Sequence, residues 1–241
     1  CAVRQSEGAA IMFQHQNIWL PDGEKHFPEW MTRNGEIVNG KGTYQIKKLR
    51  EAMKWCRQFR RAVDVGAHVG LWSMHLAGKF SMLNAFEPVP KFRDCWRMNM
   101  GAESVDVSAS YQLHCFALGA TDDTWALMSI NPADTGGTHV SVERPSVVNH
   151  MDATPMMTLD SFKFEDVDFI KIDCEGYELE VLKGAWRTIA RSKPCVIVEQ
   201  KPHKLLPNFG IKGAPAVDYL RDMGAVLRKE IGGDYILSWD A

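Results

Sequence analysis

The feature of this sequence that most constrains its fold is the stretch from residue 61 to residue 101. An apolar run ends in Asp64, a turn bounded by Gly66 and Gly70 follows, and a second apolar run ends in Glu87. Strand, tight turn, helix and strand in this order form one βαβ unit. Because ligands of such units bind outside the carboxyl ends of the strands, we expect a binding site at this turn.

The residues of the turn indicate what kind of ligand binds there. Glycine adopts a positive φ at little cost, and its missing side chain allows a flat ligand to approach the backbone. A helix that begins near Val69 directs unbonded N–H groups at the same place. Glu87 follows Asp64 by about 20 residues, a spacing at which a carboxylate binds the hydroxyls of a ribose. The stretch therefore predicts a ligand with an adenosine-like ribose.

The turn does not match the pattern expected for a dinucleotide. The fingerprint Gly-x-Gly-x-x-Gly needs glycine where this chain has His68 and Leu71. The turn lacks a cradle for pyrophosphate but keeps Asp64, whose carboxylate suits a cationic amino group. S-adenosylmethionine carries such a group, a ribose and no phosphate, so it is the predicted cofactor. A nicotinamide oxidoreductase and a turn that binds nothing are the alternatives.

A second centre of chemistry lies in the later part of the chain. The apolar run at residues 167–172 ends in Asp173 and Glu175, and another strand ends in Glu199 with His203 shortly after it. Like charges at one sheet edge are costly unless a cation or a shared proton compensates them. Asp173, Glu175 and Glu199 are therefore the predicted catalytic residues. A divalent metal held by these oxygen ligands stays open but is not favoured, and we assign no metal ligand.

Residues 43–241 alternate between strand and helix patterns, which predicts a doubly wound, mostly parallel α/β sheet closed by an antiparallel C-terminal hairpin. Further strands are expected at residues 111–118, in a hairpin with a mobile tip at residues 124–142, and in the closing hairpin at residues 226–231 and 235–239. Residues 145–155 have the composition of a linker. Helices are expected from Thr43, from Val69, after Pro90, directly after Glu175, with Trp186 facing inward, and at residues 216–223.

Residues 1–42 are interpreted as an N-terminal cap or extension of the domain at residues 43–241, which is predicted to bind S-adenosylmethionine. This segment is rich in aromatic residues, has one candidate strand near residues 11–20 and shows no helix start. It packs on the sheet or forms a wall of the substrate pocket; the sequence leaves both alternatives open.

Composition narrows the classes of function. The formal net charge is −2, which gives no reason to expect nucleic acid or a membrane as the partner. No apolar run approaches the ~18 residues of a membrane span, and no signal peptide is visible. The six cysteines contain no Cys-x-x-Cys pair and are expected to be buried thiols, with Cys115, Cys174 and Cys195 in strands. These features predict a cytoplasmic protein, and they leave a small molecule or glycan open as the molecule on which it acts.

Three segments together resemble the FkbM family of S-adenosylmethionine-dependent methyltransferases. They are residues 63–70, 85–90 and 170–185, and the strand at 196–199 also fits. The resemblance extends over residues 60–200, and the third segment is the most specific. His68 stands where the family pattern usually has asparagine.

The resemblance implies a class I methyltransferase (Rossmann-like) fold and O-methylation of a hydroxyl on a sugar or secondary metabolite. By position, Asp64, Gly66 and Ala67 line the methionine end of the cofactor, Glu87 takes the ribose, and Asp173 lies close to the sulfonium. The whole cofactor-binding set that it implies is Asp64, Gly66, Ala67, His68, Gly70, Glu87, Pro88, Phe116, Ala117 and Asp173, with Phe116 and Ala117 near the adenine.

Methyl transfer from a sulfonium is an in-line displacement that needs alignment and removal of the acceptor's proton. Asp173 and Glu175 are the first candidates for this role. The main rival is an RNA 2′-O-methyltransferase, for which Lys171, Asp173 and Glu199 supply part of the expected lysine and acid set. We expect the Lys171 side chain to point away from the crevice face on which Asp173 lies, on the condition that the strand is regular there. A non-catalytic module that binds the cofactor is a further alternative.

Overall fold

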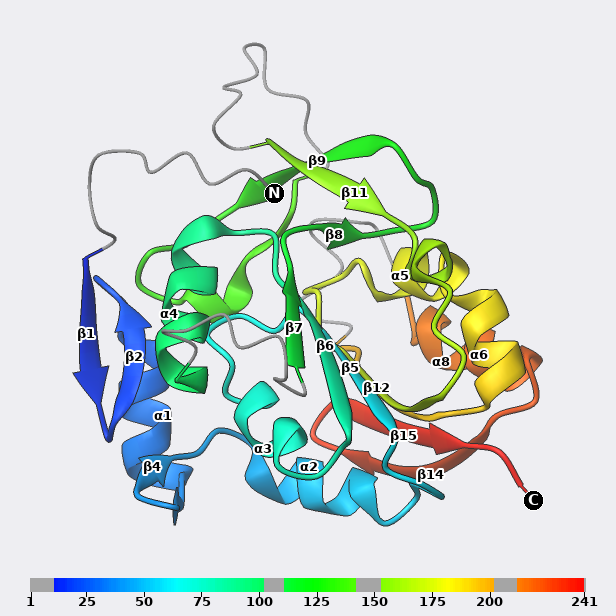
Figure 1. Ribbon diagram of the computed structural model, residues 1–241, viewed down its shortest axis with the longest axis horizontal. Coiled ribbons are helices and arrows are strands. Elements are labelled where there is room, and N and C mark those ends of the chain that lie inside the picture. Colours follow the sequence, from blue (N-terminus) through cyan, green and yellow to red (C-terminus); the bar gives the residue numbers. More distant parts are fainter. Residues whose placement is uncertain (1–10, 102–110, 142–152, 202–211, 241) are drawn as a thin grey trace.

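The computed structural model describes residues 11–101, 111–141, 153–201 and 212–240 (Figure 1). Its centre is a seven-stranded sheet in the order β14 (Val226–Ile231), β15 (Asp234–Ser238), β13 (Cys195–Glu199), β12 (Val167–Ile172), β5 (Arg61–Val65), β6 (Met82–Phe86) and β7 (Tyr111–His114). The strands from β13 to β7 pair in parallel, and β15 is antiparallel to both of its neighbours. The predicted class of fold, including the C-terminal hairpin, is confirmed.

Helices cover both faces of this sheet, as Figure 1 shows. One layer consists of α5 (Glu178–Lys183), α6 (Trp186–Ser192) and α8 (Pro215–Asp222), and the other of α2 (Ile46–Met53), α3 (Ser73–Ala77) and α4 (Pro90–Met100). Alternate residues of a strand point to opposite faces, so Val63 and Val65 pack in the first layer and Ala62 in the second. None of the described helices is both long and apolar enough to cross a lipid bilayer.

A smaller sheet lies beyond the end of β7, at the top of Figure 1. It has the order β10 (His139–Val140), β9 (Thr124–Ser129), β11 (Ala153–Met157) and β8 (Ala117–Leu118). The pairing of β9 with β10 confirms the predicted hairpin. The strand predicted at residues 111–118 is divided, because β6 ends at Phe86 and offers no partner beyond His114. The predicted linker is wrong from Ala153 onward, and its earlier residues lie outside the described part of the chain.

The N-terminal segment contains a helix that the sequence did not predict. A hairpin of β1 (Met12–His15) and β2 (Ile18–Pro21) precedes α1 (His26–Asn34), and β3 (Ile37–Val38) pairs with β4 (Lys41–Gly42). The N-cap residue of α1, Lys25, makes no side-chain capping bond. The carboxylate of Glu24 accepts a bond from the N–H of Phe27 instead, at 2.9 Å. The usual signal for a helix start is therefore displaced by one residue.

Two predicted helix starts are wrong. The helix expected from Thr43 begins at Ile46, because the Thr43 hydroxyl donates to the carbonyl of Glu36 and accepts from its N–H, both at 2.9 Å. The helix expected from Val69 begins at Ser73, since residues 66–72 form an irregular turn. Side-chain bonding outside a helix explains the first error, and the long turn explains the second.

The helix predicted directly after Glu175 begins at Glu178 and is interrupted at Gly184, so that α5 and α6 are separate. Gly184 packs against the backbone of Gly119, where a Cβ atom would lie 1.9 Å from the carbonyl oxygen. This close approach fixes the position of the break. It also turns Trp186, predicted to face inward, toward solvent with 46% of its surface exposed.

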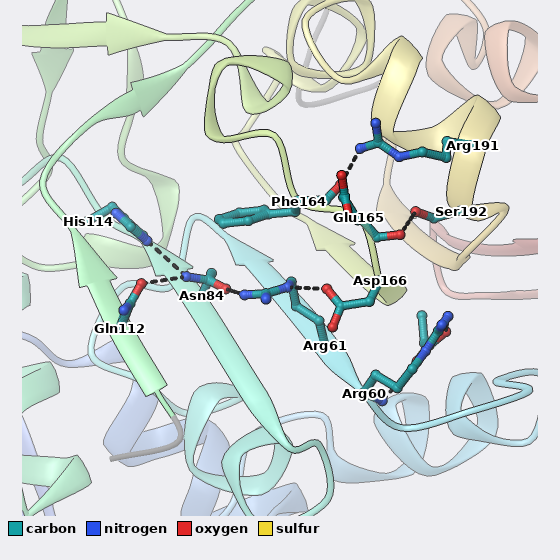
Figure 2. A network of polar contacts seen from close by, with 11 residues as sticks. Arg60, Arg61, Asn84, Gln112, His114, Phe164, Glu165, Asp166, Arg191 and Ser192 are labelled. Atoms are coloured by element: carbon teal, nitrogen blue, oxygen red, sulfur yellow. Dashed lines mark hydrogen bonds and ion pairs between the residues drawn. The ribbon is translucent and has the colours of Figure 1, made fainter. Parts of the chain in front are cut away.

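A polar network ties β5, β6 and β7 of the sheet to each other (Figure 2). The Arg61 guanidinium donates to Asp166 at 2.7 Å and to the side-chain oxygen of Asn84 at 2.6 Å. The Asn84 amide group in turn bonds Gln112 at 3.1 Å and the ring of His114 at 3.0 Å. Because these residues stand on β5, β6, β7 and the segment before β12, the network fixes the alignment of four chain segments that lead toward the same edge.

The cysteines follow the prediction in part. Cys195 lies in β13, but Cys115 and Cys174 follow the last residues of β7 and β12 rather than standing inside the strands. Cys95 and Cys195 are buried.

Candidate functional site

One cavity lies at the carboxyl ends of β5, β6, β12 and β13. Most of the predicted site residues line it, both those assigned to the cofactor and those assigned to catalysis. They are Gly66, Ala67, His68, Glu87, Pro88, Phe116, Ala117, Asp173, Glu175 and Glu199. Asp64 and Gly70 are not among its lining residues, and His203 lies outside the described residues.

The glycines of the turn have a packing role. Gly66 has a φ of +72°, and a Cβ atom there would lie 2.1 Å from the backbone oxygen of Asp173. Gly70 has a φ of +89°, and its Cβ would lie 2.9 Å from the ring of Trp96. The missing side chains therefore make room for β12 and α4, not for a flat ligand as the sequence suggested. The turn and the segment after β12 are consequently held together through backbone contact.

Asp64 lies beneath the turn. Its side chain is fully buried and accepts a bond from the Ser73 hydroxyl at 2.6 Å, and the Trp96 indole donates to the same hydroxyl at 2.9 Å. Burial raises the pKa of Asp64, although Lys171 and Ser73 oppose the rise. Asp64 thus joins β5 to α3 and reaches the cavity through Lys171.

Lys171 is a site residue that the main prediction missed. Its ammonium donates to the carbonyl of Gly66 at 2.9 Å and lies 3.6 Å from oxygens of both Asp64 and Asp173. Burial favours a lower pKa for Lys171, but the carboxylates of Asp173 and Asp64 outweigh it and the pKa is raised. The expectation that Lys171 points away from the face of Asp173 on a regular strand is wrong, because residues two apart on a strand share a face. The two-residue spacing to Asp173 was therefore the available signal. One buried cation therefore compensates two carboxylates.

Asp173, Glu175 and Glu199 meet as predicted. Each offers one carboxylate oxygen, and these three oxygens lie within 4.8 Å of one another. Lys201 forms an ion pair with Glu199. Such a group accepts a proton, and its oxygens are also of the kind that hard cations prefer. Two lysines beside it already reduce the repulsion between the acids.

The backbone that carries Glu175 is held in an uncommon conformation. Glu175 has a φ of 48°, in the left-handed region that residues other than glycine seldom adopt. The buried carboxylate of Glu178 accepts bonds from the N–H groups of Cys174 and Gly176 at 3.0 and 2.9 Å. Burial raises the pKa of Glu178 to about 7, so this carboxyl also senses pH near neutrality. The turn keeps its shape through Glu178.

Glu87 lies where the sequence placed it. One carboxylate oxygen accepts from the N–H of His68 at 2.9 Å and the other from the N–H of Val89 at 2.8 Å. Burial raises its pKa to about 7, and these two bonds oppose the rise. Each oxygen keeps a further lone pair for a ligand hydroxyl.

His68 and Trp72 present polar atoms without partners at the cavity. The His68 ring packs between Phe27 and Phe92, with centroid distances of 5.1 and 4.2 Å. Both of its ring nitrogens and the Trp72 indole nitrogen are buried with no hydrogen-bond partner. Burial lowers the pKa of His68 to about 3, so its imidazole is neutral at pH 7. Orphaned buried groups of this kind are costly, and a polar ligand in the cavity would satisfy them.

The N-terminal segment and the loop between β9 and β10 supply walls that the sequence left open. His26, Phe27 and Tyr44 line the cavity, as does Thr135. The Glu24 carboxylate joins the two walls, because it bonds the N–H of Phe27 and both the N–H (2.7 Å) and the hydroxyl of Thr135. Only contacts formed across the fold reveal this arrangement.

Comparison with known proteins gives the family. The family model described as the methyltransferase FkbM domain matches residues 64–226. "Methyltransferase 1" of Beauveria bassiana (strain ARSEF 2860) is 26% identical over 144 residues, which are 51% of this chain and 57% of that protein.

Two solved structures align with most of this chain. The FkbM methyltransferase from Methylobacillus flagellatus KT is 19% identical, with a TM-score of 0.47 over 75% of this chain and 43% of that one. Precorrin-6y C5,15-methyltransferase from Geobacter metallireducens GS-15 is 14% identical, with a TM-score of 0.47 over 87% of this chain and 97% of that one. The chain thus spans 57% of the curated relative and 43% of the Methylobacillus protein. Since the family model covers more than half of its residues, the chain belongs to the FkbM methyltransferase family.

Proposed function

We propose that the protein is an S-adenosylmethionine-dependent O-methyltransferase that acts on a hydroxyl of a sugar or secondary metabolite. The observation that carries the proposal is that one cavity combines the turn after β5, Glu87 and the group of Asp173, Glu175 and Glu199. Membership of the family supports methyl transfer, and the carboxylates support removal of a hydroxyl proton.

The lining residues fit this cofactor. The backbone of Gly66 and Ala67 with the side chains of His68 and Trp72 would hold the methionine end, where the orphaned nitrogens offer bonds to its polar groups. Glu87 has lone pairs left for the ribose hydroxyls. Phe116 and Ala117 line the same cavity and would flank the adenine.

When bound, S-adenosylmethionine supplies a methyl group on a positively charged sulfur. Asp173 would accept the proton that the acceptor hydroxyl gives up when its oxygen takes the methyl group in place of the sulfur, with Glu175 and Glu199 as the next candidates for this role. Lys171 holds Asp173 and the Gly66 backbone in one arrangement, which keeps the base aligned with the cofactor turn. The wall formed by Phe27, Tyr44 and Thr135 would exclude water from the reacting atoms.

A methyl-transfer assay tests the proposal. The protein is incubated with methyl-labelled S-adenosylmethionine and a panel of monosaccharides, glycosides and polyhydroxylated metabolites, and label in each acceptor is measured. We expect transfer to a hydroxyl and a loss of about 10²–10⁴-fold in Asp173→Asn, the usual size of a general base's contribution. The exposed Asp218→Asn is the matched control. Full turnover in Asp173→Asn would remove the catalytic role of Asp173, and transfer to nitrogen or carbon acceptors alone would contradict O-methylation.

A second candidate, an RNA 2′-O-methyltransferase, is favoured by one observation. Lys171 pairs with Asp173 and Lys201 with Glu199, so both lysines and both acids of the expected set line the cavity. The net charge of −2 argues against a phosphate-binding surface. Labelling of RNA that weakens steeply with added salt would favour this candidate. A protein that binds the cofactor but labels no acceptor would be a binding module.

A further inference from the structure

Two cysteines that are far apart in the sequence meet where α2 packs on β13. Cys195 is the first residue of β13, and its thiol donates to the carbonyl of Ala52, in the last turn of α2, at 3.3 Å. The chain continues in turns after α2, and the N–H of Cys56 donates to the Met53 carbonyl at 3.2 Å. Cys56 thus lies about one helical turn beyond Ala52 and packs in the same apolar cluster as Cys195.

The thiols of Cys56 and Cys195 are in contact. They share a hydrogen bond, and this bond, together with burial, raises the pKa of Cys195 well above its ordinary value. Cys195 is 2% exposed, whereas Cys56 is half-buried, and both are free thiols in the structure. Disulfides form between cysteines whose side chains already approach each other, and this pair meets that condition.

The segment that carries Cys56 is fixed on both sides of this residue. The guanidinium of Arg228, on β14, lies over the ring of Trp55 at 4.9 Å from its centroid. Arg57 donates to the carbonyl of Trp239 at 2.6 Å. Because the residues before and after Cys56 are tied to the C-terminal part of the chain, the Cys56 thiol is held beside β13.

From these contacts we infer that Cys56 and Cys195 form a redox-sensitive modification site, in which oxidation joins the two sulfur atoms in a disulfide that clamps α2 to β13. Reduction releases the clamp. Neither cysteine lines the cavity at the carboxyl ends of the strands, so the inference is independent of the proposed function. Disulfides of this kind in a reducing compartment are typically transient and report the redox state.

Oxidised glutathione, a low-molecular-weight disulfide, supplies the oxidant. The thiolate of the more accessible Cys56 attacks one of its sulfur atoms, and the first glutathione leaves. Cys195 then gives up its proton and attacks the Cys56 sulfur of the mixed disulfide, and the second glutathione leaves. Two protein thiols lose two electrons and two protons, and one oxidised glutathione is reduced to two glutathione molecules.

The disulfide would enclose residues 57–194, a stretch that contains β5, β6 and β12 of the central sheet. A cross-link reduces the conformational entropy of the unfolded chain, and the effect is larger for a long enclosed loop. We therefore expect oxidation to raise the Tm of the protein by roughly 5–10 °C, and dithiothreitol to reverse the increase.

Peptide mapping of the whole chain tests the inference. The protein is treated with oxidised glutathione, its remaining thiols are alkylated, and it is digested without reductant. We expect a peptide pair that joins Cys56 to Cys195 and is lighter by two hydrogen atoms than the two thiol peptides. The Tm is measured before oxidation, after it, and again after dithiothreitol.

Two variants assign the effect to this pair. Cys56→Ser and Cys195→Ser should each abolish the cross-linked peptide and the increase in Tm, and the serine at position 195 can still donate to the Ala52 carbonyl. Cys115→Ser leaves the pair intact and is the control, so it should keep both. Because each variant is tested separately, Cys56→Ser decides the outcome even where the change at the buried position prevents folding.

Four results would overturn the inference. They are a lasting mixed disulfide between glutathione and Cys56, alkylation of both thiols after oxidation, a cross-link with an unchanged Tm, and an increase in Tm that persists in Cys56→Ser.

Discussion

At the scale of single residues, the arrangement of the site depends on close backbone contacts. Gly66 allows the turn after β5 to touch the carbonyl of Asp173, and Lys171 bonds the Gly66 carbonyl while it faces two acids. The sequence identified Gly66 and Asp173 as site residues. It did not show that they touch, since they are far apart in the chain. The consequence is that a change at Gly66 affects the end of β12 as well as the turn.

Gly66→Ala should therefore destabilise the fold more than its backbone angle explains. We expect the free energy of unfolding to fall by about 3 kcal/mol or more, because the methyl group meets a backbone oxygen that has no room to move. Gly101 is the matched control, since its φ of +71° is nearly the same and no atom of the described residues lies within 4 Å of its missing side chain. Gly101→Ala should cost roughly 1 kcal/mol. Equal losses for the two variants in urea denaturation would show that the contact has no role.

The raised pKa of Glu178 predicts how the free energy of unfolding depends on pH. Its pKa is raised from 4.5 to about 7 by burial, so the folded protein binds this proton more tightly than the unfolded chain does. The stabilising effect is complete below pH 4.5 and is lost as the pH rises through 7; the full shift corresponds to roughly 3 kcal/mol. Glu178→Gln keeps the acceptor oxygen for Cys174 and Gly176 but does not titrate. The variant should lose less stability than the wild type between pH 5 and pH 8.

The free energies of unfolding of the wild type and of Glu178→Gln, measured at pH 5 and pH 8, test this prediction. Glu87 has a raised pKa as well and continues to contribute its own slope in the variant, so the dependence should flatten without disappearing. The same slope in both proteins would mean that Glu178 does not titrate in this range. Far-UV circular dichroism of the folded variant at both pH values controls for a change of structure.

At the scale of elements, the N-terminal segment completes the cavity. Glu24 connects α1 to the loop between β9 and β10 through its bond to Thr135, which is 111 residues away in the sequence. Phe27 of α1 packs on His68 in the turn after β5. The position of α1 is therefore linked both to the loop between β9 and β10 and to this turn.

Glu24→Ala should release this connection. The change leaves the N–H groups of Phe27 and Thr135 without their partner, and we expect a loss of about 2 kcal/mol in stability. Amide hydrogen exchange in α1 should become faster, while exchange in β5 and β12 stays slow. Glu29→Ala on the exposed side of the same helix is the control and should change stability by less than about 0.5 kcal/mol. Unchanged exchange in α1 would show that Glu24 does not hold the helix.

At the scale of the whole molecule, the sequence predicted the sheet and its functional edge but not the walls around that edge. Parallel strands joined by helices bring their carboxyl ends to one edge of the sheet, so acids that follow these strands are expected to lie close together there. Local sequence patterns are enough to predict this edge. The walls depend on contacts between distant segments, such as Phe27 with His68.

The errors in the elements have two origins. Side-chain bonds outside the helices hid α1 and moved the start of α2, although the bonded residues are only three and seven positions apart. The end of β6 divided the strand at residues 111–118. The charge balance of the site was also hidden, because Lys171 was considered only for the rival function. In these last two cases a deciding partner, β6 or Gly66, lies outside the local window that a sequence pattern covers.

The most direct test of the central claim is calorimetric titration of the protein with S-adenosylhomocysteine, alongside NAD. The account predicts binding of one S-adenosylhomocysteine per chain and no comparable heat with NAD. It also predicts that Glu87→Ala weakens the binding at least tenfold, because the ribose hydroxyls lose the Glu87 carboxylate as their hydrogen-bond partner. Absence of S-adenosylhomocysteine binding, or tighter binding of NAD, would contradict the account.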